Sequence, residues 1–183
     1  MSILYLHGFA SSVRPGNKKY TELSRIDRVA PFAPDYSQGF AAVMESSLAF
    51  VAAIGDITGI VGTSMGGYTA SHIAGELNLP FVAINPSLNP SQTLKKYIGQ
   101  QQNYDGSSYE LTLEQVSSYP EFNAAAQGLI IVSELDEVIP AAHTQAFAQD
   151  KQLPIISCNY GDHRFEDISK LIEKIAKHLQ AAQ

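Results

Sequence analysis

Six short apolar runs that alternate with helix-like segments constrain the fold of this chain most. The runs cover residues 3–6, 28–31, 58–61, 81–84, 129–132 and 155–159, and most of them are continuous. Continuous runs predict strands that are covered on both faces, as in a parallel sheet. The intervening helices are expected at 18–24, 39–53, 65–77, 141–149 and 166–179. We therefore expect an open α/β sheet that binds ligands beyond the carboxyl ends of its strands.

Residues from about 90 to 122 interrupt this alternation. The stretch is rich in glutamine, serine and asparagine, and it holds four of the nine tyrosines: Tyr97, Tyr104, Tyr109 and Tyr119. A structureless loop of this length is unusual in a compact domain. We expect a small cap insertion with one or two short helices, at 92–98 and 113–117, within a single domain that spans residues 1–183. A mobile surface excursion is the alternative.

The third apolar run leads into Gly62-Thr63-Ser64-Met65-Gly66, a G-x-S-x-G sequence followed by a helical pattern. Strand, sharp turn and helix form the setting in which this motif becomes a nucleophile elbow, with the serine oxygen above the sheet. The two glycines avoid Cβ clashes with the neighbouring strand and helix. The pentapeptide alone is a weak signal. Its meaning depends on a base, an orienting acid and oxyanion donors in the right order.

His163 is the expected base for Ser64. It follows the last apolar run, in a glycine-containing loop before the final helix, so it can reach across the strand ends toward the serine. His72 lies on the helix that leads away from the serine, and His178 lies on the terminal helix. His143, at the start of another helix, is a minor alternative.

Asp136 is the expected orienting acid. It comes four residues after the fifth apolar run, and the chain order Ser…Asp/Glu…His restricts the acid to positions between 64 and 163. Glu134 and Glu137 are local competitors. Asp162 adjoins the histidine, but neighbouring loop residues rarely point toward each other, so it ranks lower.

The oxyanion hole is expected to combine two backbone N–H groups. One belongs to Met65, directly after the serine, and the other to the loop after the first apolar run. In that loop Gly8 lets the backbone approach closely, and Phe9 is the expected donor, with Ala10 as the alternative. His7 is expected to hold the loop rather than to take part in the chemistry.

Several of these segments together resemble the YqiA/YcfP-like esterases of the α/β-hydrolase superfamily. The resemblance rests on residues 3–9, 11–12, 60–68, 85–86, 97–100, 136–138 and 161–165. It implies a compact α/β-hydrolase fold, with a mostly parallel six-stranded sheet and helices on both faces. By position it implies Ser64 as nucleophile, Asp136 as orienting acid and His163 as base. The glycine-rich turn that the family has before the acid is replaced here by Ser133-Glu134-Leu135.

Composition narrows the class of partner. The net charge of −6 and the absence of a basic cluster argue against a nucleic-acid partner. Cys158 is the only cysteine, so it is expected to be a buried structural thiol. No metal-ligand spacing occurs, and no cofactor is expected. No signal-like or membrane-spanning apolar run is present, so we expect a cytoplasmic protein.

These features favour a serine esterase that acts on a small, mostly apolar acyl ester or thioester. We expect Tyr97 and Tyr104 to contact the substrate. An acyltransferase, or a thioesterase for acyl-CoA or lipidated proteins, would use the same acyl-enzyme. A non-catalytic binding protein on the same fold is a third interpretation, but it predicts an eroded motif. Oligomeric state, natural substrate and acyl length have no signal in the sequence.

Overall fold

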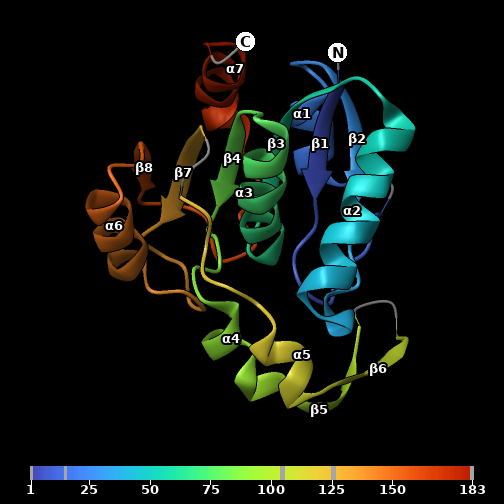
Figure 1. Cartoon of the computed structure of the whole chain (residues 1–183). Helices are drawn as coiled ribbons and strands as arrows, with labels where there is room; N and C mark the ends of the chain where they lie inside the picture. Colours follow the sequence, from blue (N-terminus) through green and yellow to red (C-terminus); the bar gives the residue numbers. More distant parts are fainter. Residues whose placement is uncertain (1, 15, 104–105, 125–126, 182–183) are drawn as a thin grey trace.

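A six-stranded parallel sheet forms the centre of the computed structural model, which describes residues 2–14, 16–103, 106–124 and 127–181 (Figure 1). Its strands are β1 (Ser2–Leu6), β2 (Arg28–Phe32), β3 (Ile57–Thr63), β4 (Phe81–Ile84), β7 (Gly128–Ser133) and β8 (Ile155–Cys158). Their order is β2-β1-β3-β4-β7-β8, and each neighbouring pair is parallel. The predicted parallel α/β sheet is thus confirmed.

Helices cover both faces of the sheet. They are α1 (Lys18–Leu23), α2 (Phe40–Ile54), α3 (Met65–Leu77), α6 (Ala141–Asp150) and α7 (Ile172–Ala181). Side chains of α2 and α3 pack into one apolar core, and side chains of α1 and α7 pack into another. This arrangement explains why the strands have continuous apolar sequences, since neither face is left to solvent.

Successive residues of one strand enter different cores. Leu4 and Leu6 of β1 point into the core shared with α2 and α3, whereas Ile3 and Tyr5 point into the core shared with α1 and α7. All four side chains are at most 3% exposed. The two-residue period of a strand therefore divides a single apolar run between two layers of helices.

The 90–122 segment lies at the carboxyl ends of the strands, opposite both termini (Figure 1). It contains α4 (Pro90–Thr93), a 3-10 turn (Lys95–Tyr97), an antiparallel hairpin of β5 (Gly99–Gln102) and β6 (Ser108–Leu111), and α5 (Leu113–Ser117). The helix expected at 113–117 is present. The helix expected at 92–98 is divided into a short α-helix that ends at Thr93 and the 3-10 turn at Lys95–Tyr97, and the hairpin follows. That hairpin is largely polar, so no continuous apolar run predicts its strands.

Apolar burial attaches the 90–122 segment to the domain. Leu111 and Val116 are fully buried in the core that α2 and α3 share, and Leu94 is 3% exposed there. Tyr119 is also buried, and its hydroxyl donates to the carbonyl oxygen of Tyr36 at 2.6 Å. The described part of the segment is therefore packed against the domain.

The last helix begins later than the sequence pattern predicts. A 3-10 turn at Ser169–Leu171 precedes α7, which starts at Ile172 rather than near residue 166. Phe165 is fully buried and has a positive φ of 47°, a conformation incompatible with a helix start. The chain before α7 is thus a shaped loop, and His163 lies in it. Within the described ranges, no helix has the length and apolar character needed to cross a membrane.

Candidate active site

Ser64 occupies a strained turn between β3 and α3. Its φ of 57° and ψ of −121° are unusual for a residue with a side chain, and its backbone N–H donates to the Ile84 carbonyl oxygen at 2.9 Å. Such a conformation costs on the order of 1–3 kcal/mol and persists only where the surrounding structure enforces it. The turn has the geometry that the nucleophile-elbow interpretation requires.

Gly62 and Gly66 allow this turn because neither has room for a Cβ atom. A Cβ at Gly62 would lie 2.1 Å from the carbonyl oxygen of Gly66, and a Cβ at Gly66 would lie 2.1 Å from that of Leu6. At Gly62 the end of β3 lies directly against the start of α3, and at Gly66 the start of α3 lies directly against the end of β1. The glycines of the motif are therefore required by close backbone approach on both sides of the serine.

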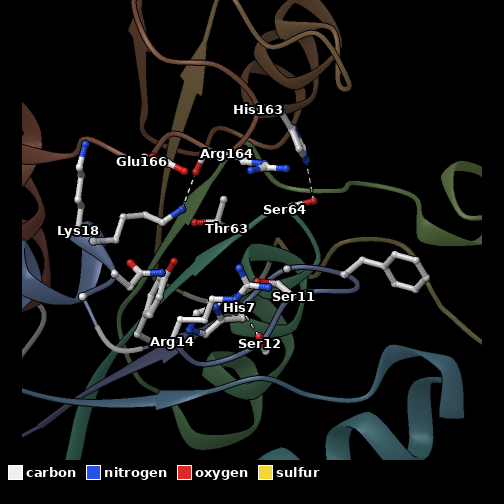
Figure 2. A pocket seen from close by; sticks show the side chains of 16 residues that line it. His7, Ser11, Ser12, Arg14, Lys18, Thr63, Ser64, His163, Arg164 and Glu166 are labelled. Atoms are coloured by element: carbon white, nitrogen blue, oxygen red, sulfur yellow. Dashed lines mark hydrogen bonds between the residues drawn. The ribbon is translucent and has the colours of Figure 1, made fainter. Parts of the chain in front are cut away.

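Three side chains expected to act together are in hydrogen-bond contact. His163 Nε2 lies 3.0 Å from Ser64 Oγ, and Figure 2 shows the two side chains pointing at each other. On the other side of the ring, His163 Nδ1 lies 2.9 Å from Oδ2 of Asp136 and 3.0 Å from Oδ1. The Asp136 side chain is 0% exposed and that of His163 16% exposed. The imidazole is thus held between a buried carboxylate and the serine hydroxyl.

Two backbone donors fix the carboxylate of Asp136. Its Oδ1 accepts from the N–H groups of Val138 and Ile139, both at 2.8 Å. The competing acids have other partners: Glu137 accepts from the backbone N–H of His163 at 2.9 Å, and Asp162 accepts from that of Phe165 at 3.0 Å. Glu137 therefore holds the main chain of the histidine, while Asp136 contacts its ring.

A buried polar network that the sequence analysis did not identify supports the His163 loop. Asn85, directly after β4, donates from Nδ2 to the carbonyl oxygens of Asp162 and His163, each at 3.1 Å. Its Oδ1 accepts from the N–H of Ser133 at 2.8 Å, and the Ser133 hydroxyl donates to the carbonyl oxygens of Tyr160 and Gly161. Both side chains are fully buried.

The sequence signal for this network is the position of each residue at the end of an apolar run. Parallel strand ends converge on one edge of the sheet, so polar residues there can meet.

The loop after β1 passes beside Ser64. A Cβ added at Gly8 would lie 3.1 Å from the Thr63 carbonyl oxygen and 3.9 Å from Ser64 Oγ. The loop is fixed by the Tyr36 hydroxyl, which donates to the His7 carbonyl oxygen at 2.8 Å. The backbone of this loop therefore approaches Ser64 closely at Gly8.

Met65 and Phe9 are the expected oxyanion donors. Met65 is the first residue of α3, so its N–H has no carbonyl partner within the helix, and it sits at the positive end of the helix dipole. Phe9 follows Gly8 in the loop after β1.

Burial keeps two of the other histidines neutral. It lowers the pKa of His7 to about 4, with a smaller contribution from the charge of Lys19, and it lowers the pKa of His72 to about 4 as well. His7 lies 3.3 Å from Ser11 Oγ through Nδ1, and His72 contacts the Glu121 carbonyl oxygen through Nε2 at 3.1 Å. Both rings have partners other than Ser64.

A cavity of about 400 Å³ opens beside Ser64 and His163. It lies between the loop after β1 and the loop that carries His163 (Figure 2). No described residue of the 90–122 segment lines it. Tyr97, an expected substrate contact, instead packs its ring 5.5 Å from the ring of Phe9, which does line the cavity. Tyr104, the second expected contact, lies outside the described residues.

Across the described ranges, no group of three or more histidine, cysteine, aspartate or glutamate side chains is arranged to hold a metal ion. The carboxylates of Asp136, Glu137 and Asp162 instead accept from the His163 ring or from backbone N–H groups.

Comparison with known sequences gives matches along nearly the whole chain. The model of a family described as "Uncharacterised protein family (UPF0227)" matches residues 2–180. A UPF0227 protein of Vibrio parahaemolyticus is 29% identical over 187 residues, which cover 98% of this chain and 96% of that protein.

Comparison with solved structures identifies the fold. Mouse alpha/beta hydrolase domain-containing protein 10 matches with a TM-score of 0.72 at 16% identity, covering 100% of this chain and 90% of its own. A monoacylglycerol lipase of Paleococcus ferrophilus matches with a TM-score of 0.69 at 14% identity, covering 97% of this chain and 94% of its own. The α/β-hydrolase fold is thereby confirmed.

Proposed function

The chain belongs to the uncharacterised protein family UPF0227, and on the basis of its site we propose that it is a serine hydrolase of carboxylic esters or thioesters. The observation that carries the proposal is the hydrogen-bonded series Asp136–His163–Ser64, with contacts of 2.9 and 3.0 Å. Structural relatives whose names include a hydrolase and a lipase support the same reaction class. Acyl transfer needs a nucleophile, a base and a group that orients the base, and these three residues supply them.

In the first half of the reaction, Ser64 Oγ forms a bond to the acyl carbon while its proton passes to His163 Nε2. The negative charge moves to the carbonyl oxygen, where the N–H groups of Met65 and Phe9 would stabilise it. Each such donor lowers the activation barrier by roughly 3 kcal/mol in enzymes of this kind. Asp136 accepts from His163 Nδ1, which fixes the ring tautomer and stabilises the imidazolium that forms.

In the second half, the intermediate collapses and the bond to the leaving group breaks. His163 donates its proton to that oxygen or sulfur, so an alcohol or thiol departs and an acyl-enzyme remains. Water then attacks the acyl carbon while His163 takes its proton, the bond from Ser64 Oγ to the acyl carbon breaks, and His163 returns the proton to Oγ as the acid leaves. Tyr97 would shape the site through the Phe9 ring rather than by direct contact with the cavity.

Covalent labelling tests the proposal. A fluorophosphonate probe should label the wild-type protein, and peptide mapping should place the label on Ser64, while Ser64→Ala should take none. His163→Ala should label at least about a hundredfold more slowly, because the hydroxyl loses its base. A folded wild-type protein that takes no more label than Ser64→Ala would contradict the proposed function.

The acyl preference is tested separately. Rates for p-nitrophenyl acetate, butyrate and octanoate, each paired with the matching thioester, would define both the chain length and the bond. A small acyl substrate predicts that kcat/KM falls as the chain lengthens. A rate that rises steadily to octanoate would contradict the small substrate but leave the serine chemistry intact.

A further inference from the structure

Lys19 is a buried cation in the wall of the cavity that holds Ser64. It lies in α1, is 7% exposed and lines the same cavity as Ser64 and His163. Lysine is almost never buried to this extent without a charged partner, since removing an ammonium from water is costly. Burial accordingly lowers its pKa to about 8.

The described part of the chain places the Tyr5 ring near the ammonium, 6.0 Å from its centroid to Nζ, but supplies no ion pair. The ammonium donates to the backbone carbonyl oxygen of Arg164, and among the described residues it forms no ion pair. An ammonium has three donors, so donors are left for a ligand. The nearby acids, Glu166 and Asp162, raise its pKa, but less than burial lowers it.

The other charged side chains in the cavity wall are mostly basic. Arg14, Lys18 and Arg164 line the cavity together with Lys19, whereas Glu166 is the one acidic residue among the described lining. Over the whole chain the balance is the opposite, with 12 basic and 18 acidic residues. Figure 2 shows Arg14 and Arg164 on two different sides of the hollow, one on each of the loops that form it. The cavity is thus a basic site within an acidic protein, and such sites attract anions.

We propose that this cavity binds an anionic group of the substrate, a carboxylate or a phosphate, and that the ammonium of Lys19 is its main contact. The proposal rests on the proposed function, because it concerns the substrate of Ser64. A negative charge on the substrate is not indicated by the tyrosines of the 90–122 segment. The substrate is then a small ester or thioester with a negative charge on its acyl or alcohol part, close enough to enter the same cavity as the scissile bond.

Matched esters that differ in charge test the proposal. For the alcohol side, 4-acetoxybenzoate and 4-acetoxyphenyl phosphate are compared with neutral 4-acetoxybenzamide. For the acyl side, monoethyl adipate is compared with ethyl adipamate. We expect kcat/KM to favour an anionic ester by about tenfold or more in at least one series, as charge-assisted hydrogen bonds of ordinary strength predict. The benzoate and phosphate arms distinguish the two kinds of anion.

Lys19→Met keeps the length and apolar stem of the side chain and removes its charge. The preference for the anion should fall to about onefold, because the charge that distinguishes the anionic ester from the neutral one is gone. Lys177→Met, an exposed lysine on α7 that does not line the cavity, is the matched control and should keep the preference. If Lys19→Met does not fold, Arg14→Gln at the exposed rim should still reduce the preference about threefold.

Equal rates for charged and neutral esters in both series would overturn the proposal while leaving the serine hydrolase intact. An anion preference that survives both Lys19→Met and Arg14→Gln would also overturn it. If no ester is hydrolysed and Ser64 takes no probe, the proposed function fails, and binding becomes the readout. Benzoate or inorganic phosphate should then raise the melting temperature of wild-type protein but not of Lys19→Met, and no rise in either would contradict the anion site.

Discussion

The loops that hold Ser64, Asp136 and His163 differ from the 90–122 segment in what holds them. The site loops are fixed by buried polar contacts, above all those of Asn85 and Ser133, which join the ends of β4 and β7 to the His163 loop. The 90–122 segment is attached mainly by apolar side chains such as Leu111 and Val116.

This difference distinguishes residues that fix the positions of the site atoms from residues that mainly stabilise the fold. A hydrogen bond is directional and fixes the position of an atom, whereas apolar burial is non-directional and depends on the area removed from water. Substitutions in the site loops should therefore lower activity, with or without a loss of stability. Substitutions in the 90–122 segment should lower stability with little change in activity. The four predictions below test this contrast, from the largest expected effect to the smallest.

Asp136→Asn should lower kcat by about 10³–10⁴-fold with little change in the unfolding midpoint. The amide keeps the shape of the side chain, but it no longer stabilises the imidazolium and it permits the wrong ring tautomer. Steady-state rates with p-nitrophenyl acetate measure the effect, and thermal unfolding measures the stability. Glu134→Gln, an exposed acid in the same loop, is the control and should retain its activity. A loss of the same size in Glu134→Gln, or none in Asp136→Asn, would remove Asp136 from its proposed role.

Leu111→Ala should cost about 2–5 kcal/mol of unfolding free energy, because it leaves a cavity in the core. Leu111 is 0% exposed, whereas the nearby Leu113 is 58% exposed, so Leu113→Ala should cost no more than about 0.5 kcal/mol. Denaturant unfolding measures both. In conditions where Leu111→Ala is folded, its kcat should stay within about threefold of wild type, since the described part of the segment does not line the Ser64 cavity. A large loss of kcat without loss of stability would show that the two regions are coupled.

The same contrast determines how much the sequence alone predicts. The six strands and the positions of Ser64, Asp136 and His163 follow from apolar runs and from residues just beyond them, since strand ends in a parallel sheet converge. The hairpin of β5 and β6 has no such signal: Gln100, Gln101 and Gln102 carry no apolar periodicity, and its pairing depends on burial of Leu111 against α2 and α3. The burial of Lys19 also has no signal in the sequence, because an isolated Lys18-Lys19 pair suggests a solvated surface. Only the fold shows that Lys19 faces inward.

Asn85→Leu should lower kcat by about ten- to a hundredfold and also cost about 1–3 kcal/mol of stability. The leucine fills the space but leaves the N–H of Ser133 and the carbonyl oxygens of Asp162 and His163 without their partner. Because Asn85 positions the base and does not touch the substrate, the loss should appear in kcat more than in KM.

The chain offers a matched control for that substitution. Asn78 has a similar positive φ, 52° against 44°, but it caps the far end of α3. Asn78→Leu should therefore show the strain cost of roughly 1 kcal/mol without the loss of kcat. Equal kinetic effects in the two variants would show that Asn85 acts through backbone conformation, not through the His163 loop.

The smallest expected effect is the pH dependence of the preference for an anionic ester in the cavity beside Ser64. The pKa of Lys19 is lowered to about 8 by burial, so its ammonium is charged below that pH and neutral above it. Glu166 and Asp162 raise this pKa and Arg164 lowers it, and a bound anion would raise it further. The ratio of kcat/KM for 4-acetoxybenzoate to that for 4-acetoxybenzamide should therefore fall about tenfold between about pH 6.5 and about pH 9.5. Both esters need the same catalytic groups and the benzoate stays ionised throughout, so the ratio cancels their shared pH dependence and reports the cavity alone. In Lys19→Met the ratio should be flat, and a wild-type ratio that is equally flat would mean that the buried ammonium does not contact the substrate.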